Sequence, residues 1–143
     1  MEALFIRRAL KEPSATRRKT LDAVVRKFLR FWKKTGQQHF REEEEVLLPA
    51  WSRHVRLDKE PLLMRLVAEH AQIRAQIADL EAALESDQPI EGPATELARL
   101  LHDHVRFEEN EVFPRAERLL SEKELVALGC SLSWLHPKRS CEI

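Results

Sequence analysis

Residues 39–49 read HFREEEEVLLP, and residues 104–114 read HVRFEENEVFP. Laid over each other, the two stretches share a histidine, an arginine, two consecutive glutamates and a final proline at the same offsets. In each stretch the histidine and the first of the shared glutamates are four residues apart. Because residues four apart lie on one face of a helix, each stretch is expected to present an imidazole beside a carboxylate.

The two pairs are His39 with Glu43 and His104 with Glu108. One imidazole and one carboxylate, presented twice from two helices, form a typical ligand set for a pair of first-row metal ions. A single copy would favour a plainer interpretation, an exposed histidine beside a solvated run of glutamates. Two matched copies favour a metal site.

The composition favours helices and a protein that stays out of the membrane. The 143 residues include three Gly and no Tyr, whereas the helix formers Leu, Ala, Glu and Arg are abundant. This length predicts one domain over residues 1–130, followed by a tail over residues 131–143.

No apolar run approaches membrane-spanning length and no secretory signal core is found, so we expect a cytoplasmic protein. In that reducing compartment Cys130 and Cys141 are expected to be free thiols.

Hydrophobic periodicity and helix-capping residues predict an all-α chain. The predicted helices cover residues 2–11, 14 to about 51, 61 to about 85, 94–119 and 121 to about 129. Pro49 is expected near the end of the second helix, and Pro114 is expected to kink the fourth. Residues 86–93 are expected to form a turn, and Gly129 is expected to cap the last helix.

Two of these helices have regular seams of core positions, which predict an up-down four-helix bundle. The seam of the second helix is Leu21, Val25, Phe28, Trp32, Thr35, His39, Glu43 and Val46. The seam of the third is Leu63, Leu66, His70, Ile73, Ile77, Leu80 and Leu84. Histidines therefore occupy core positions, where each needs a hydrogen-bond partner or a metal.

The depth of the histidines in the bundle supports a shared site. His39 and His104 each lie ten residues before the proline of their stretch. His70 lies nine residues after Pro61, on a helix that runs the other way. At about 1.5 Å per residue, all three lie roughly 14–15 Å from the same end of the bundle. Three imidazoles and the two repeat carboxylates would thus meet at one level, where bound cations offset the cost of burying the acids.

Imidazole with carboxylate suits iron, manganese, zinc or cobalt, and two carboxylates that can bridge favour a pair of ions. The His-x-x-x-Glu order differs from the Glu-x-x-His of ferritin-like di-iron proteins, and no His-Glu-x-x-His of a zinc protease occurs. The remaining acids of the two stretches are expected on solvated faces or in an outer shell around the metal. They are Glu42, Glu44, Glu45, Glu109 and Glu111.

These patterns resemble a hemerythrin-like (HHE cation-binding) domain over roughly residues 14–120. The matching pieces are His39, Glu43 and Pro49; Glu69-His70-Ala71-Gln72-Ile73; and His104, Glu108 and Pro114. The resemblance implies a four-helix bundle that holds a non-haem di-iron centre, with Glu43 and Glu108 bridging the irons. It implies that His39, His70 and His104 are terminal ligands. It also implies O2 binding, oxygen or redox sensing, iron handling or a response to nitric oxide.

The chain departs from this family pattern in its first helix, which normally supplies another histidine. No histidine precedes His39. A helix over residues 2–11 spans roughly 16 Å, whereas His39 lies roughly 37 Å along the next helix, so this shortened first helix cannot reach the metal level.

Three alternatives remain open. A second copy could complete the bundle as a homodimer, the short extra C-terminal helix could fold back and bring His136 or Cys130 near the metal, or the site could stay incomplete and open.

Three functions fit the sequence. The favoured one is a metal-binding protein, with iron ahead of zinc or manganese and O2 or another small ligand at the metal. A di-iron oxidase or peroxidase is less favoured, because no base, nucleophile or substrate pocket can be named. The third is a metal-free interaction protein that uses the basic residues 1–41, whose twelve Lys/Arg and three acids give a net charge of +9. No recognition motif accompanies these basic residues, so we expect no nucleic-acid partner.

Overall fold

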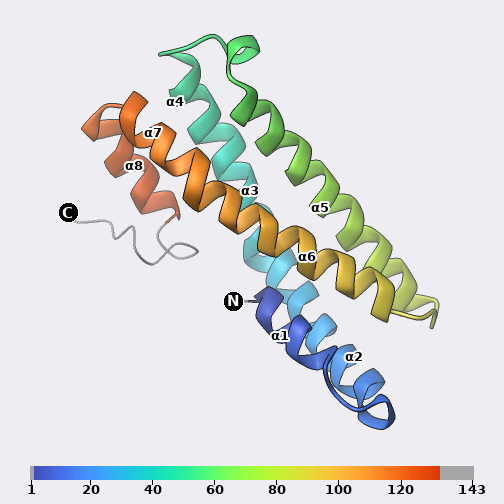
Figure 1. Ribbon diagram of the computed structural model, residues 1–143. Coiled ribbons are helices and arrows are strands. Elements are labelled where there is room, and N and C mark those ends of the chain that lie inside the picture. Colours follow the sequence, from blue (N-terminus) through green and yellow to red (C-terminus); the bar gives the residue numbers. More distant parts are fainter. Residues whose placement is uncertain (1, 133–143) are drawn as a thin grey trace. The chain divides into compact units, whose positions relative to one another are not determined.

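The computed structural model describes residues 2–132 and, among them, the side chains of residues 3–128. Every regular element of this described part is helical (Figure 1). The α-helices are α1 (Glu2–Ala9), α2 (Ser14–Phe31), α3 (Gln37–Glu42), α4 (Leu48–Ser52), α5 (Pro61–Glu85), α6 (Glu91–Phe107), α7 (Phe113–Leu119) and α8 (Glu122–Leu132). Single π-helical turns cover Trp32–Gly36, Glu43–Leu47 and Glu108–Val112, and a 3-10 turn covers Leu57–Lys59. The all-α fold class predicted from the sequence is confirmed.

Two helical runs are longer than single helices. Residues 14–52 are helical without a break through α2, α3, α4 and two π-helical turns, so Gly36 does not interrupt the run. Residues 91–119 are helical through α6, α7 and the third π-helical turn. Neither proline ends its run. Pro49 and Pro114 are each the second residue after a π-helical turn. The regular backbone hydrogen-bond pattern already changes at such a turn, so a residue without an N–H is tolerated there.

Two predicted boundaries are wrong. The turn predicted over residues 86–93 is shorter, because α6 begins at Glu91 and Pro93 lies in its first turn, again a position that tolerates proline. The predicted C-cap at Gly129 is also wrong, because α8 continues to Leu132. A glycine lowers helix propensity but does not by itself end a helix.

The π-helical turns change which side chains face the core. The sequence seam predicted Val46 inside, but Val46 is 37% exposed, whereas Leu47 is 1% exposed. In the turn Glu43–Leu47 the backbone N–H of Leu48 donates to the carbonyl of Glu43, five residues back. This wider turn adds a residue to the repeat and moves the buried position along by one. The turn Glu108–Val112 has the same pattern, with the N–H of Phe113 donating to the carbonyl of Glu108.

The described chain divides into two compact units. The first contains the residues up to Lys34 together with Glu69–Arg106, and there α1 packs against α2 (Figure 1). A salt bridge joins Arg18 of α2 to Asp87, in the turn after α5. Another joins Lys33, in the π-helical turn after α2, to Glu81 near the end of α5. The buried residues of this unit's part of α5 are His70, Ile73, Ile77, Leu80 and Leu84, all as predicted.

The second unit contains Thr35–Ala68 and the chain from Phe107 onward. Its core is made of Leu47, Ala50, Trp51, Leu63, Leu66, Phe107, Val112, Phe113, Ala116, Leu120 and Leu128. Helix α8 packs against α3, which contains His39, and adds Leu128 to this core. The last helix is therefore part of this unit's packing. The side chains of Cys130, His136 and Cys141 lie outside the described residues, so the proposed approach of Cys130 or His136 to the metal stays a prediction.

The capping box predicted for the last helix is confirmed. The backbone N–H of Ser121 donates to Oε2 of Glu124 at 2.9 Å, and the N–H of Glu124 donates to Oγ of Ser121 at 3.2 Å. The same Glu124 oxygen lies 2.9 Å from Nε2 of His54, in the segment after α4. One carboxylate therefore both starts α8 and ties it to the preceding part of the unit.

No helix within residues 2–132 is both long enough and apolar enough to cross a lipid bilayer. The single domain over residues 1–130 and the homodimer stay predictions.

The register shift predicts unequal effects of two neighbouring substitutions. Leu47→Ala is expected to lower the free energy of unfolding by about 2–5 kcal/mol, because it leaves a cavity in the core. Val46→Ala is expected to change it by less than about 0.5 kcal/mol, because Val46 is largely at the surface. Urea denaturation of both variants measures this. Equal losses, or a larger loss for Val46→Ala, would contradict the π-helical register.

The capping box predicts that Glu124 contributes to the free energy of unfolding in a pH-dependent way. The Ser121 backbone hydrogen bond, followed by the one from His54, lowers the pKa of Glu124. A carboxyl whose pKa is lowered by folding stabilises the protein above its unfolded pKa, and this stabilisation is lost as the pH falls through the folded pKa. Glu124→Gln is therefore expected to be less stable than the wild type at pH 7, with the difference shrinking at pH 3. Urea denaturation at both pH values checks this, and the exposed Glu122→Gln is the control.

Candidate metal centre

Two buried histidines face each other on α5 and α6. His70 is completely buried and His104 nearly so, and their ring centroids are 4.9 Å apart with the planes inclined at 66°. His70 lies on the α5 seam between Leu66 and Ile73, both fully buried, so the packing of the apolar neighbours turns its ring inward. Both histidines were predicted to be in the core.

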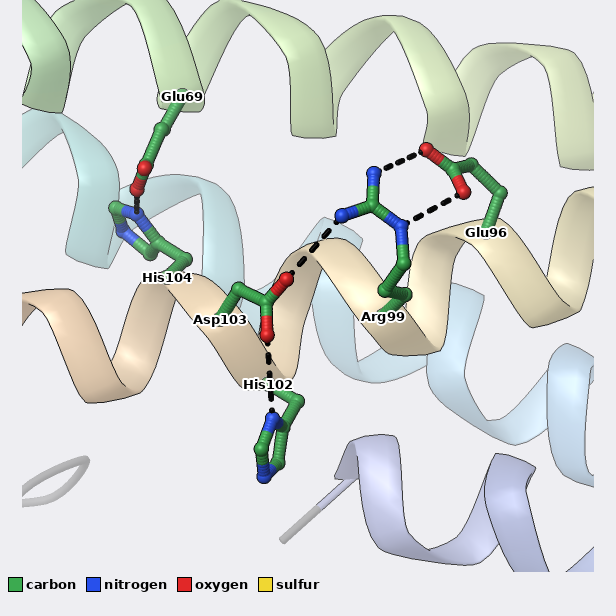
Figure 2. Close-up of polar contacts among 6 residues, drawn as sticks. All are labelled: Glu69, Glu96, Arg99, His102, Asp103 and His104. Atoms are coloured by element: carbon green, nitrogen blue, oxygen red, sulfur yellow. Dashed lines mark hydrogen bonds and ion pairs between the residues drawn. The ribbon is translucent and has the colours of Figure 1, made fainter.

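A carboxylate on α5 contacts the ring of His104. Its Nδ1 lies 2.7 Å from Oε2 of Glu69, the residue before His70 (Figure 2). An ionised carboxylate only accepts hydrogen bonds, so Nδ1 is the nitrogen that carries the proton and donates. In the neutral ring this leaves the lone pair on Nε2.

Glu69 is a functional candidate for which no role was predicted from the sequence, although it is part of the segment that carries the family resemblance. The acids expected in an outer shell all lay within the two repeats, and Glu69 lies between them on α5. Its position directly before a core histidine was a usable signal, because neighbouring residues on a helix differ by about 100° in direction and the acid can point toward the adjacent helix.

His39 and Glu43 form the contact that their four-residue spacing predicted. His39 Nε2 lies 2.9 Å from Oε1 of Glu43, and both side chains are buried. Glu43 is 0% exposed and stands at the first position of its π-helical turn. Glu108 is 1% exposed and stands at the first position of the matching turn. Both repeat carboxylates are therefore inside the protein.

The other acids of the repeats behave largely as predicted. Glu45 and Glu111 are exposed and paired with Arg41 and Arg65, and Glu109 is exposed. Glu42 and Glu44 are half-buried. These side chains therefore keep contact with water, and the full burial of Glu43 and Glu108 sets those two apart.

Four of the five predicted ligands form a compact donor group. One ligand atom each from Glu43, His70, His104 and Glu108 lies within 4.8 Å of the other three, and all four residues are buried. His39 is outside this group and is connected to it through Glu43.

The chemistry of the donor group fits a metal cation. Two imidazole nitrogens and two carboxylate oxygens are ligands that iron, manganese and zinc accept. Two buried carboxylates without compensation would each cost several kcal/mol by the usual order of magnitude. A divalent cation offsets this cost and also binds the imidazoles. The buried His/Glu cluster can therefore hold a metal.

Comparison with known families agrees with this chemistry. The family model described as "Hemerythrin HHE cation binding domain" matches residues 2–116. Searches of curated proteins and of solved structures each return no match. The family match covers α1 through the first residues of α7 and includes all five predicted ligands. The chain therefore belongs to the hemerythrin HHE cation-binding domain family.

Proposed function

We propose that this protein holds a pair of non-haem iron ions and uses them to bind O2 or another small ligand, as an oxygen or redox sensor or in iron handling. The observation that supports it most is the group of four buried donors within 4.8 Å of one another. Membership in a cation-binding family supports a metal in this position. The preference for iron, and for two ions, comes from the ligand types and from carboxylates that can bridge.

The residues that would hold the iron are His39, Glu43, His70, His104 and Glu108. An iron pair would supply reversible redox chemistry and coordination positions for a small ligand. The protein's own contribution is to keep these donors buried, which excludes bulk water and strengthens electrostatic interactions at the site. The contact between His39 and Glu43 holds one carboxylate beside an imidazole on the same helical run.

The histidines should be required for metal-dependent stability. In a buffer with a chelator the wild type is expected to unfold at a lower temperature than with anaerobic Fe(II). A ligand at 100 times its dissociation constant adds about 2.7 kcal/mol to the free energy of unfolding. His70→Ala and His104→Ala are expected to lose most of this gain. Thermal unfolding with and without Fe(II), together with metal analysis per chain, measures the effect.

The matched control is His102→Ala. His102 is exposed and lies two residues before His104 on α6, pointing away from α5 (Figure 2). It should keep the full Fe(II)-dependent gain. If the wild type gains nothing from Fe(II), Mn(II) or Zn(II), the metal-binding proposal fails and a metal-free interaction protein becomes the better explanation.

The repeat carboxylate Glu108 can be tested against a neighbouring control. Glu108→Gln keeps the size of the side chain but removes its charge, so bound iron per chain is expected to fall to half or less. Glu109→Gln is the control, because Glu109 is exposed one residue away and should keep the wild-type iron content. Iron content per chain is measured for both variants after anaerobic loading and desalting. Equal iron content in both variants would remove Glu108 from the ligand set.

A further inference from the structure

We propose that Glu69 is a positioning residue of the metal centre, which holds His104 through Nδ1 so that Nε2 is presented to the ion. This inference rests on the proposed function, because it assumes a metal at His104. The observation behind it is the hydrogen bond of 2.7 Å between Glu69 Oε2 and His104 Nδ1.

The proton arrangement makes this contact useful for metal binding. A neutral histidine can carry its proton on either ring nitrogen, and only the other nitrogen can bind a cation. Because the carboxylate accepts from Nδ1, it favours the form whose free lone pair is on Nε2. The negative charge of Glu69 also makes the imidazole a stronger donor toward the ion, as carboxylate partners of metal-bound histidines do.

The positions of the residues in the fold make the orientation rigid. Glu69 and His70 are neighbours on α5, and Glu69 reaches across to α6 (Figure 2). One turn of α5 therefore supplies a ligand of its own and fixes the ring of the ligand on the next helix. Glu69 is only half-buried, at 18% side-chain exposure, whereas the His104 ring is 3% exposed, so the carboxylate reaches from the edge of the site to a buried ring.

The roles of Glu69 and Glu43 differ. Glu43 contacts Nε2 of His39 and belongs to the four-donor group, whereas Glu69 contacts the Nδ1 side of His104 and is not in that group. Glu69 is therefore placed behind a ligand, where it acts on the metal through His104. Removing it should weaken binding without removing a ligand.

The experiment measures Zn(II) affinity by competition with a chelator, since Zn(II) has no redox chemistry to complicate the result. Glu69→Ala is expected to bind Zn(II) about 10–100-fold more weakly than the wild type. Glu69→Gln keeps a carbonyl that accepts from Nδ1, so its affinity should lie between those two. The control is Glu81→Ala, on the same helix roughly 18 Å away and paired with Lys33, which should stay within about twofold of the wild type.

A second readout reports the ring itself. The ¹⁵N chemical shifts of the His104 ring should show a protonated Nδ1 and a metal-bound Nε2 in the Zn(II)-loaded wild type, and this pattern should weaken in Glu69→Ala. A purely structural role for Glu69 would lower the stability of the metal-free protein without changing these shifts.

Several outcomes overturn the proposal. Wild-type affinity and unchanged His104 shifts in Glu69→Ala would remove the positioning role, and so would equal weakening in Glu69→Ala and Glu81→Ala. If Glu69→Ala does not fold, Glu69→Gln decides, because intermediate affinity supports the role and wild-type affinity with unchanged shifts contradicts it. A wild type that binds no Zn(II), Fe(II) or Mn(II) would instead show that the proposed function itself fails.

Discussion

Buried acid in the core of a small helical protein is the constraint on which the rest of this structure depends. Glu43 and Glu108 are essentially inaccessible to water, and each occupies a helix position that an aliphatic residue would fill at no electrostatic cost. The surrounding structure is consistent with compensation for these charges. Imidazoles are buried with them, and the neighbouring acids of each repeat stay at the surface. The family to which the chain belongs is a cation-binding one, which explains why such a costly arrangement is kept.

Much of this could be predicted from periodicity. The α5 seam from Leu63 to Leu84 is buried at every predicted position, because an uninterrupted α-helix repeats every 3.6 residues. The capping box at Ser121 was also predictable, since its hydrogen bonds are local. Burial of His39, Glu43 and His70 followed from their place on the seams, and burial of His104 and Glu108 followed from the matching repeat. Whether those residues bind a metal is a separate question that burial alone does not answer.

The features that sequence reasoning missed have physical reasons. Val46 was expected inside because a 3.6-residue repeat was assumed, and the π-helical turn adds a residue that periodicity does not reveal. The proposed role of Glu69 also depends on how close α5 lies to α6, a tertiary property that its place before a core histidine does not reveal by itself. The packing of α8 against α3 likewise depends on tertiary contacts, which exposed helix faces alone do not specify.

The wide turns also have a consequence for how this chain can change in length. A π-helical turn contains one residue more than an α-helical turn. Loss of one residue within Glu43–Leu47 could therefore be absorbed by conversion of this turn to α-helix, which would leave the fully buried indole of Trp51 in the core. Loss of one residue from an uninterrupted α-helix would instead rotate all the following side chains by about 100°. The exposed connection at residues 52–54 has no such angular requirement and could gain or lose a residue at small cost. Single-residue changes of length in related chains are thus expected in such connections and in the π-helical turns.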